Sequence, residues 1–125
     1  MGGNVIHVSI TGFRNDKGEA YCALYAPGKS FPTDPTGALA HVSVAVSSGA
    51  AVCKFEGVAP GRYAVSVFHD ENSNRKMDTN FLGIPKEGVG ASNDAKGKMG
   101  PPKFDAAAFS YSGGQLDLTI RIFYI

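Results

Sequence analysis

Side-chain oxygens recur at alternate positions in the segment 69–78, which reads His-Asp-Glu-Asn-Ser-Asn-Arg-Lys-Met-Asp. Counted from its first aspartate, this loop has oxygen-bearing side chains at positions 1, 3, 5 and 9 and a backbone carbonyl at position 7, supplied in turn by Asp70, Asn72, Asn74, Asp78 and Lys76. EF-hand-type loops coordinate Ca²⁺ with this spacing, because a hard cation takes about six to eight oxygen ligands and alternate loop residues can point inward. The pattern therefore predicts a calcium site in this segment.

Two positions depart from the calcium-binding pattern. Arg75 stands at position 6, where Gly is usual, and Phe81 stands at position 12, where a bidentate Glu is usual. Glu71 or Glu87 would then complete the negative charge of the site. The alternative is an Asx-rich turn, in which the Asp and Asn side chains cap their own backbone and Arg75 or Lys76 pairs with the carboxylates. Both interpretations stay open at the level of the sequence.

Three residues are further candidates for contact with a ligand: His69, Lys86 and Glu87. His69 directly precedes Asp70 at a predicted strand end, so it would either anchor the loop by hydrogen bonds or act as a general base. The sequence contains no nucleophile elbow, no HExxH and no phosphate-binding loop. We therefore favour the anchoring role, assign no catalytic residue and expect that the protein is not an enzyme. A hydrolase-like enzyme using His69, Asp70 and Glu87 is the alternative.

The elements that must position these residues are short β-strands separated by turns, as 16 Gly and 7 Pro suggest. Period-two alternation of apolar and polar residues is clearest in 62–68 and 115–125. It predicts a core that includes Val65, Val67, Leu116, Leu118 and Ile120. Further strands are predicted at 4–13, 19–26, 38–47 and 51–56, and the segment 104–111 reads as one helical turn or as a strand.

Short connections predict which strands pair. Residues 4–13 and 19–26 should form a hairpin, and residues 51–56 should pair back on 38–47. About seven strands and no long helix indicate an all-β fold, an antiparallel two-sheet sandwich that occupies residues 1–125 as one domain. The long loop at 69–103 would interrupt this sandwich, and loops of such length are generally functional or carry structure of their own.

Composition excludes several classes of function. A net charge of +1 and the lack of a Lys/Arg cluster give no electrostatic basis for binding nucleic acid. No apolar run approaches the roughly 20 residues of a membrane-spanning helix. With 43% hydrophobic residues, the chain is also unlike a disordered protein.

Four stretches carry a resemblance to a known family, namely Gly61–Val65, His69–Asn74, Met77–Gly88 and Gly100–Phe104. They resemble the signature of the DUF2141 family, which comprises small, usually exported bacterial proteins without an assigned biochemical function. The similarity covers nearly the whole chain, although Ser73 and Arg75 stand where the family loop usually has glycines. The turn at 58–63 is also similar to a turn of prealbumin-like sandwiches, a fold related to immunoglobulin-like ones. The resemblance implies a β fold and no particular reaction.

The resemblance also bears on location and on the two cysteines. No signal-peptide pattern follows Met1, so the chain is either a mature form whose leader was removed or a cytoplasmic protein. The family's usual export implies a periplasmic or secreted protein. Cys22 and Cys53 would be two buried thiols or a disulfide, and export favours the disulfide.

We therefore expect an exported binding or interaction module whose long loop, ordered by calcium, contacts an unknown small molecule or protein. A structural accessory domain of the cell envelope is a further alternative. The sequence leaves the oligomeric state undetermined.

Overall fold

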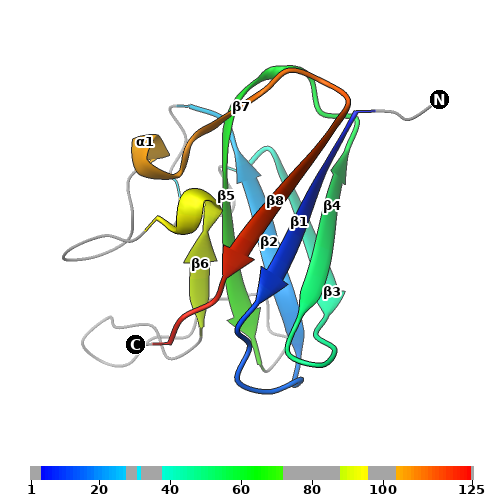
Figure 1. Ribbon diagram of the computed structural model, residues 1–125, viewed down its shortest axis with the longest axis vertical. Coiled ribbons are helices and arrows are strands. Elements are labelled where there is room, and N and C mark those ends of the chain that lie inside the picture. The colour runs from blue at the N-terminus through cyan, green and yellow to red at the C-terminus, as the bar shows by residue number, and fades with distance from the viewer. Residues whose placement is uncertain (1–3, 28–30, 32–37, 72–87, 96–103, 125) are drawn as a thin grey trace.

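The structure is a computed structural model that describes residues 4–27, 31, 38–71, 88–95 and 104–124. Two packed sheets account for most of it, as Figure 1 shows. The elements, in chain order, are β1 (Val5–Thr11), β2 (Glu19–Tyr25), β3 (Ala40–Ala45), β4 (Ala51–Glu56), β5 (Gly61–Asp70), β6 (Val89–Ala91), the short 3-10 helix η2 (Ser92–Asp94), α1 (Phe104–Ala107), β7 (Phe109–Tyr111) and β8 (Gln115–Arg121). The predicted two-sheet sandwich is confirmed.

The smaller sheet has three strands in the order β4-β1-β8, and the larger sheet has the order β3-β2-β5-β6 with β7 also paired to β5. All strand pairs are antiparallel except β1 and β8, which run parallel. The chain therefore brings its first and last strands side by side (Figure 1). An isolated bridge between Val89 and Phe123 links the two sheets at one edge of the sandwich.

The core lies between the sheets and follows the alternation of the sequence. Every second residue of β1 is fully buried, and β8 contributes Ile120 in the same way. Of the five residues predicted for the core, Val65, Val67 and Ile120 are buried, while Leu116 and Leu118 are partly buried and pack against it. Period-two patterning thus identified the inward face of both sheets.

The predicted hairpins are wrong, because the strands that follow one another along the chain belong to different sheets. β1 pairs with β4 and β8, whereas β2 pairs with β3 and β5. Likewise β3 and β4 lie in opposite sheets, and only the bridge between Ser47 and Ala50 joins the ends of their connection. The connections 12–18 and 46–50 cross over the core. A short connection keeps two strands near each other, but it does not decide whether they pair sideways or face each other.

A disulfide joins the two sheets through the middle of the core. It links Cys22 of β2 to Cys53 of β4, and both residues are fully buried. The disulfide that family membership favoured is confirmed. Because β2 and β4 are not hydrogen-bonded neighbours, the bond ties the sheets directly to each other.

The larger sheet carries a second apolar layer on its outer face. Tyr21, Ala23 and Tyr25 alternate with the core residues of β2 and are also buried, so β2 is apolar on both faces. Phe31 and Phe104 pack on this outer face at ring-centroid distances of 5.2 Å from Tyr25 and 6.0 Å from each other. Ala107 of α1 packs in one apolar cluster with Ala64 of β5 and these two phenylalanines, and Figure 1 shows α1 beside β5 and β6. The smaller sheet has no such layer among the described residues.

The predicted loop at 69–103 is partly regular structure, so its boundaries are corrected. His69 and Asp70 are the last residues of β5, and 89–94 form β6 and η2. The ambiguous segment 104–111 contains both predicted forms, the helical turn α1 followed by strand β7. Among the described residues, no helix has the length and apolar character needed to cross a membrane.

Candidate functional site

β5 ends in two fully buried polar residues, His69 and Asp70. Because side chains alternate along a strand, they lie on opposite faces of the larger sheet. His69 lies on the core side, where the ring of Phe13 meets it edge-on with centroids 5.0 Å apart. Only Glu71 separates the end of β5 from the segment 72–87.

Both ring nitrogens of His69 are hydrogen-bonded. Nε2 is 2.7 Å from the carbonyl oxygen of Lys17, which can only accept, so Nε2 carries the proton and donates. Nδ1 is 2.9 Å from the hydroxyl of Tyr124, and that hydroxyl also accepts a bond of 2.8 Å from the backbone N–H of Arg14. In the neutral ring the Tyr124 hydroxyl therefore donates to Nδ1. The bonds form one continuous chain from Arg14 to Lys17.

Glu71 is held by the connection between β1 and β2. Its carboxylate forms a two-bond pair with the Arg14 guanidinium, which includes an Nε donation of 3.1 Å, and it accepts a bond of 2.8 Å from Asn15. The hydrogen bond from Arg14 lowers the pKa of Glu71, against the opposing effect of burial. The same guanidinium lies 4.6 Å from the centre of the Tyr124 ring. Burial of Tyr124 raises the pKa of its hydroxyl.

The residues that flank the segment 72–87 lie next to each other. The backbone N–H of His69 donates to the carbonyl of Gly88 over 2.8 Å. Gly88 itself packs against Ile122 and Tyr124 so closely that an added Cβ would lie 2.5 Å from a side-chain carbon of Ile122. The residues on either side of the segment 72–87 therefore lie next to each other, beside the His69 network.

Only part of the predicted site lies in the described part of the chain. His69 and Asp70 are described, while the other candidate ligands lie outside the described residues: Asn72, Asn74, Lys76, Asp78, Lys86 and Glu87. Glu71, considered as a source of charge for a cation, is instead engaged by Arg14 and Asn15. Within the described ranges no cluster of three or more His, Cys, Asp or Glu residues is arranged to hold a metal ion.

The network contains residues that the sequence did not single out. Arg14 and Asn15 belong to a turn, and Tyr124 lies 55 residues from His69, so no local motif connects them. A buried histidine at a strand end requires partners for both nitrogens, and that requirement is the one signal that could have prompted a search for them.

The hydrogen bonds of His69 and Glu71 connect the end of β5 to the connection between β1 and β2 and to Tyr124 near the C-terminus. A family model described as uncharacterised protein conserved in bacteria (DUF2141) matches residues 8–119. The chain belongs to the DUF2141 family. Comparison with curated proteins and with solved structures gave no match. The span matched to DUF2141 includes Arg14, His69 and Glu71, whereas Tyr124 lies just beyond it.

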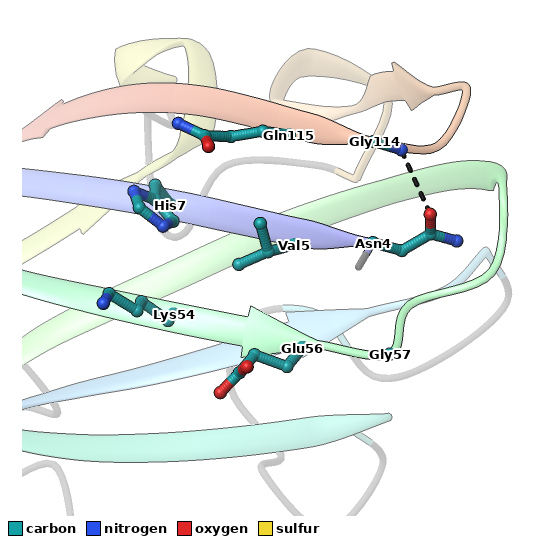
Figure 2. Close-up of a pocket in the computed structure, with 8 residues that line it drawn as sticks. All are labelled: Asn4, Val5, His7, Lys54, Glu56, Gly57, Gly114 and Gln115. Atoms are coloured by element: carbon teal, nitrogen blue, oxygen red, sulfur yellow. Dashed lines mark hydrogen bonds between the residues drawn. The ribbon is translucent and has the colours of Figure 1, made fainter. Parts of the chain in front are cut away.

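An open depression of about 330 Å³ lies on the outer face of the smaller sheet of this DUF2141 protein. Figure 2 shows its lining side chains on the three neighbouring strands, with Val5 and His7 of β1 in the middle. Gly57 and Gly114 lie at its end, and both have positive φ. His7 Nδ1 is 3.7 Å from the carboxylate of Asp117.

Proposed function

We propose that this DUF2141 protein is a non-catalytic binding module of the periplasm or the extracellular space. Its recognition surface would be the segment 72–87 together with the exposed side chain of Arg14. Binding residues are commonly carried by loops that a rigid scaffold positions. The observation that supports the proposal is that the residues flanking this segment on both sides, His69 to Glu71 and Gly88, are held together beside Tyr124 and Arg14.

The location is supported by the disulfide between Cys22 and Cys53. Disulfides persist in oxidising compartments and are rare in the bacterial cytosol. A protein with an inter-sheet disulfide in its core is therefore suited to the cell exterior or the periplasm.

The anchoring role of His69 is better supported than catalysis. A general base needs a ring nitrogen that can accept a proton from the substrate. In His69, Nδ1 accepts from Tyr124 and Nε2 donates to Lys17, and the residue is fully buried. Proton abstraction by His69 would require breaking this network first.

The bound cation in this proposal is Ca²⁺, held by Asp70, Asn72, Asn74 and Asp78 and the carbonyl of Lys76. The spacing of these oxygens supports it, as does the position of Asp70 at the end of β5. Two carboxylates are few for a calcium loop, so the dissociation constant should fall near the weak range of extracellular modules, on the order of 10⁻⁴–10⁻³ M.

The test measures the melting temperature of the disulfide-bonded protein with millimolar CaCl₂ and with a chelator. Calcium should raise it, since a ligand that binds only the folded state stabilises that state. Asp70→Asn should abolish the rise, Arg75→Gly should enlarge it, and the exposed control Asp105→Asn should leave it unchanged. If calcium has no effect on the wild type, the Asx-rich turn is the correct interpretation.

The recognition surface is tested by replacing residues 72–87 with a short Gly/Ser linker. We expect a folded protein that no longer shows melting shifts with the divalent cations, oligosaccharides or lipids that shift the wild type. Shifts that persist in the linker variant would place the binding site elsewhere.

A further inference from the structure

The smaller sheet has two edges whose backbone groups are turned outward. The N–H of Gly57 donates to the carbonyl of Asn4 over 2.9 Å. In the antiparallel pair of β1 and β4, this bond shows which residues of β4 direct their backbone groups toward β1 and which direct them outward. Val52, Lys54 and Glu56 therefore direct their N–H and C=O groups away from β1. For β8 the same information comes from two bonds in the parallel pair with β1. The N–H of Val5 donates to the carbonyl of Gly114 over 2.9 Å, and the N–H of Ile122 donates to the carbonyl of Thr11 over 2.8 Å. The outward groups there are those of Gln115, Asp117 and Thr119.

Both edges carry charged residues, but within the described ranges neither has the other usual protections against pairing, a proline or a covering strand. β4 and β8 contain no proline, and in the described part of the chain no strand pairs with their outer sides. The C-terminal end of β8 is covered by η2, and the N–H of Arg121 there donates to the Asp94 carboxylate over 2.9 Å. Val52 is 50% exposed although it is a large apolar residue on an edge strand.

The two edges are complementary to each other. When β4 of one copy is laid antiparallel to β8 of a second copy with Lys54 opposite Asp117, Val52 meets Thr119 and Glu56 meets Gln115. These pairs join opposite charges, two β-branched side chains, and a carboxylate with an amide donor. All these residues have outward backbone groups and side chains on the outer face, so each pair can exchange two backbone hydrogen bonds.

We propose that this protein self-associates head to tail, with β4 of one molecule pairing to β8 of the next in this register. The contact joins two different surfaces and keeps the strand directions of each sheet. It therefore leaves a free β4 at one end and a free β8 at the other, and association continues as an open chain. The depression of Figure 2 lies on the outer face between the two edges, and Lys54, Glu56 and Gln115 are among its lining residues.

Pairing of like edges is less favourable. Two β4 strands centred on Lys54 place like charges opposite each other. A shifted register would set Lys54 against Glu56, but the turn at Gly57, which has a φ of 70°, ends the strand there and shortens the pairing. Two β8 strands bring opposite charges together only when Asp117 of one lies opposite Arg121 of the other. That pairing needs the backbone N–H of Arg121, which already donates to the Asp94 carboxylate. Charge at an edge usually prevents association, but here it selects the unlike pair.

Sedimentation velocity of the disulfide-bonded protein from micromolar to millimolar concentration tests the proposal. The wild type should show a concentration-dependent series of species without a fixed end point. Lys54→Asp and Asp117→Lys should each weaken association by about tenfold, because each turns the central attraction into a repulsion. The double variant Lys54→Asp with Asp117→Lys should associate as the wild type does.

Mixing the two single variants gives the decisive result. Each variant alone should associate about tenfold more weakly than the wild type, whereas an equimolar mixture should associate as the wild type does, because each edge then meets an opposite charge on the other variant. Urea midpoints equal to that of the wild type establish that the variants are folded. A wild type that stays monomeric at millimolar concentration, single variants that associate unchanged, or a mixture that stays monomeric would each overturn the proposal.

Discussion

Tyr124→Phe tests the hydrogen-bond network around His69, next to the residues that flank the segment 72–87. The substitution removes one hydroxyl and keeps the ring that packs against Gly88 and lies beneath the Arg14 guanidinium. Arg14 N–H is in an exposed position and can bond to water instead. His69 is fully buried, so its Nδ1 would lose its donor without a replacement from solvent.

The expected cost follows from that difference. A buried acceptor left without a partner costs about 1–3 kcal/mol of the free energy of unfolding. At a middle value of about 2 kcal/mol, the melting temperature of a domain of this size should fall by roughly 6–12 °C. The amide of His69, which donates to Gly88, should also lose protection from hydrogen exchange, because the base of the segment opens more often.

Urea denaturation, read together with hydrogen exchange, measures the effect, and the chain provides a matched control. The hydroxyl of Tyr63 donates to the carbonyl of Ala59 over 2.6 Å, and Ala59 is exposed. Tyr63→Phe removes the same atom but leaves an acceptor that water can reach, so it should cost less. Equal losses of stability in the two variants would refute the reasoning that both nitrogens of His69 need their partners.

Three further predictions concern other parts of the structure. Replacing Cys22 and Cys53 with alanine should lower the free energy of unfolding by about 4 kcal/mol, from the loop entropy of a 31-residue separation, and a urea midpoint like that of the wild type would contradict this. Arg14 lowers the pKa of Glu71 in the folded state, so the wild type should have a higher free energy of unfolding than Glu71→Gln at neutral pH. This difference should disappear as the pH falls through and below the ordinary glutamate pKa, and urea midpoints that diverge on acidification would be inconsistent with it. Asn93 has a φ of 60°, and its side-chain amide donates to two carbonyls beside α1. Asn93→Ala should therefore lower the free energy of unfolding by about 1–2 kcal/mol and Asn93→Gly by less, and thermal melts that rank the variants the other way would show that backbone strain is unimportant there.

The alternation of apolar residues predicted most of the strands, because it reports directly on which side chains face the core. The strand Ala51–Glu56 has the predicted bounds, and β8 begins at Gln115 as expected. Alternation does not report on neighbours, so the pairing of β1 with β4 and β8 was not predicted. β6 was missed because it has only three residues, including Gly90, and is defined by its partners.

The site was predictable to the extent that it is local. The position of His69 at a strand end next to a polar segment followed from the sequence, and its anchoring contacts agree with the role that we favoured. The partners could not be predicted, because Arg14 and Tyr124 are separated by 110 residues and meet only through the parallel pairing of β1 and β8. The continuation of β5 through Asp70 also exceeded the prediction, since strand ends depend on tertiary contacts.

The place of β1 between β4 and β8 determines the order in which a growing chain can complete its fold. A ribosome or a translocation channel releases β1 first, yet one side of this strand has no partner until residues 115–121 have emerged. The pairing of β2 with β3 and β5 requires the chain only as far as residue 70, so these three strands of the larger sheet can assemble earlier. Closure of the smaller sheet is then a late and long-range event, which slows folding. A chain of this topology therefore stays incompletely folded until nearly its last strand has been delivered.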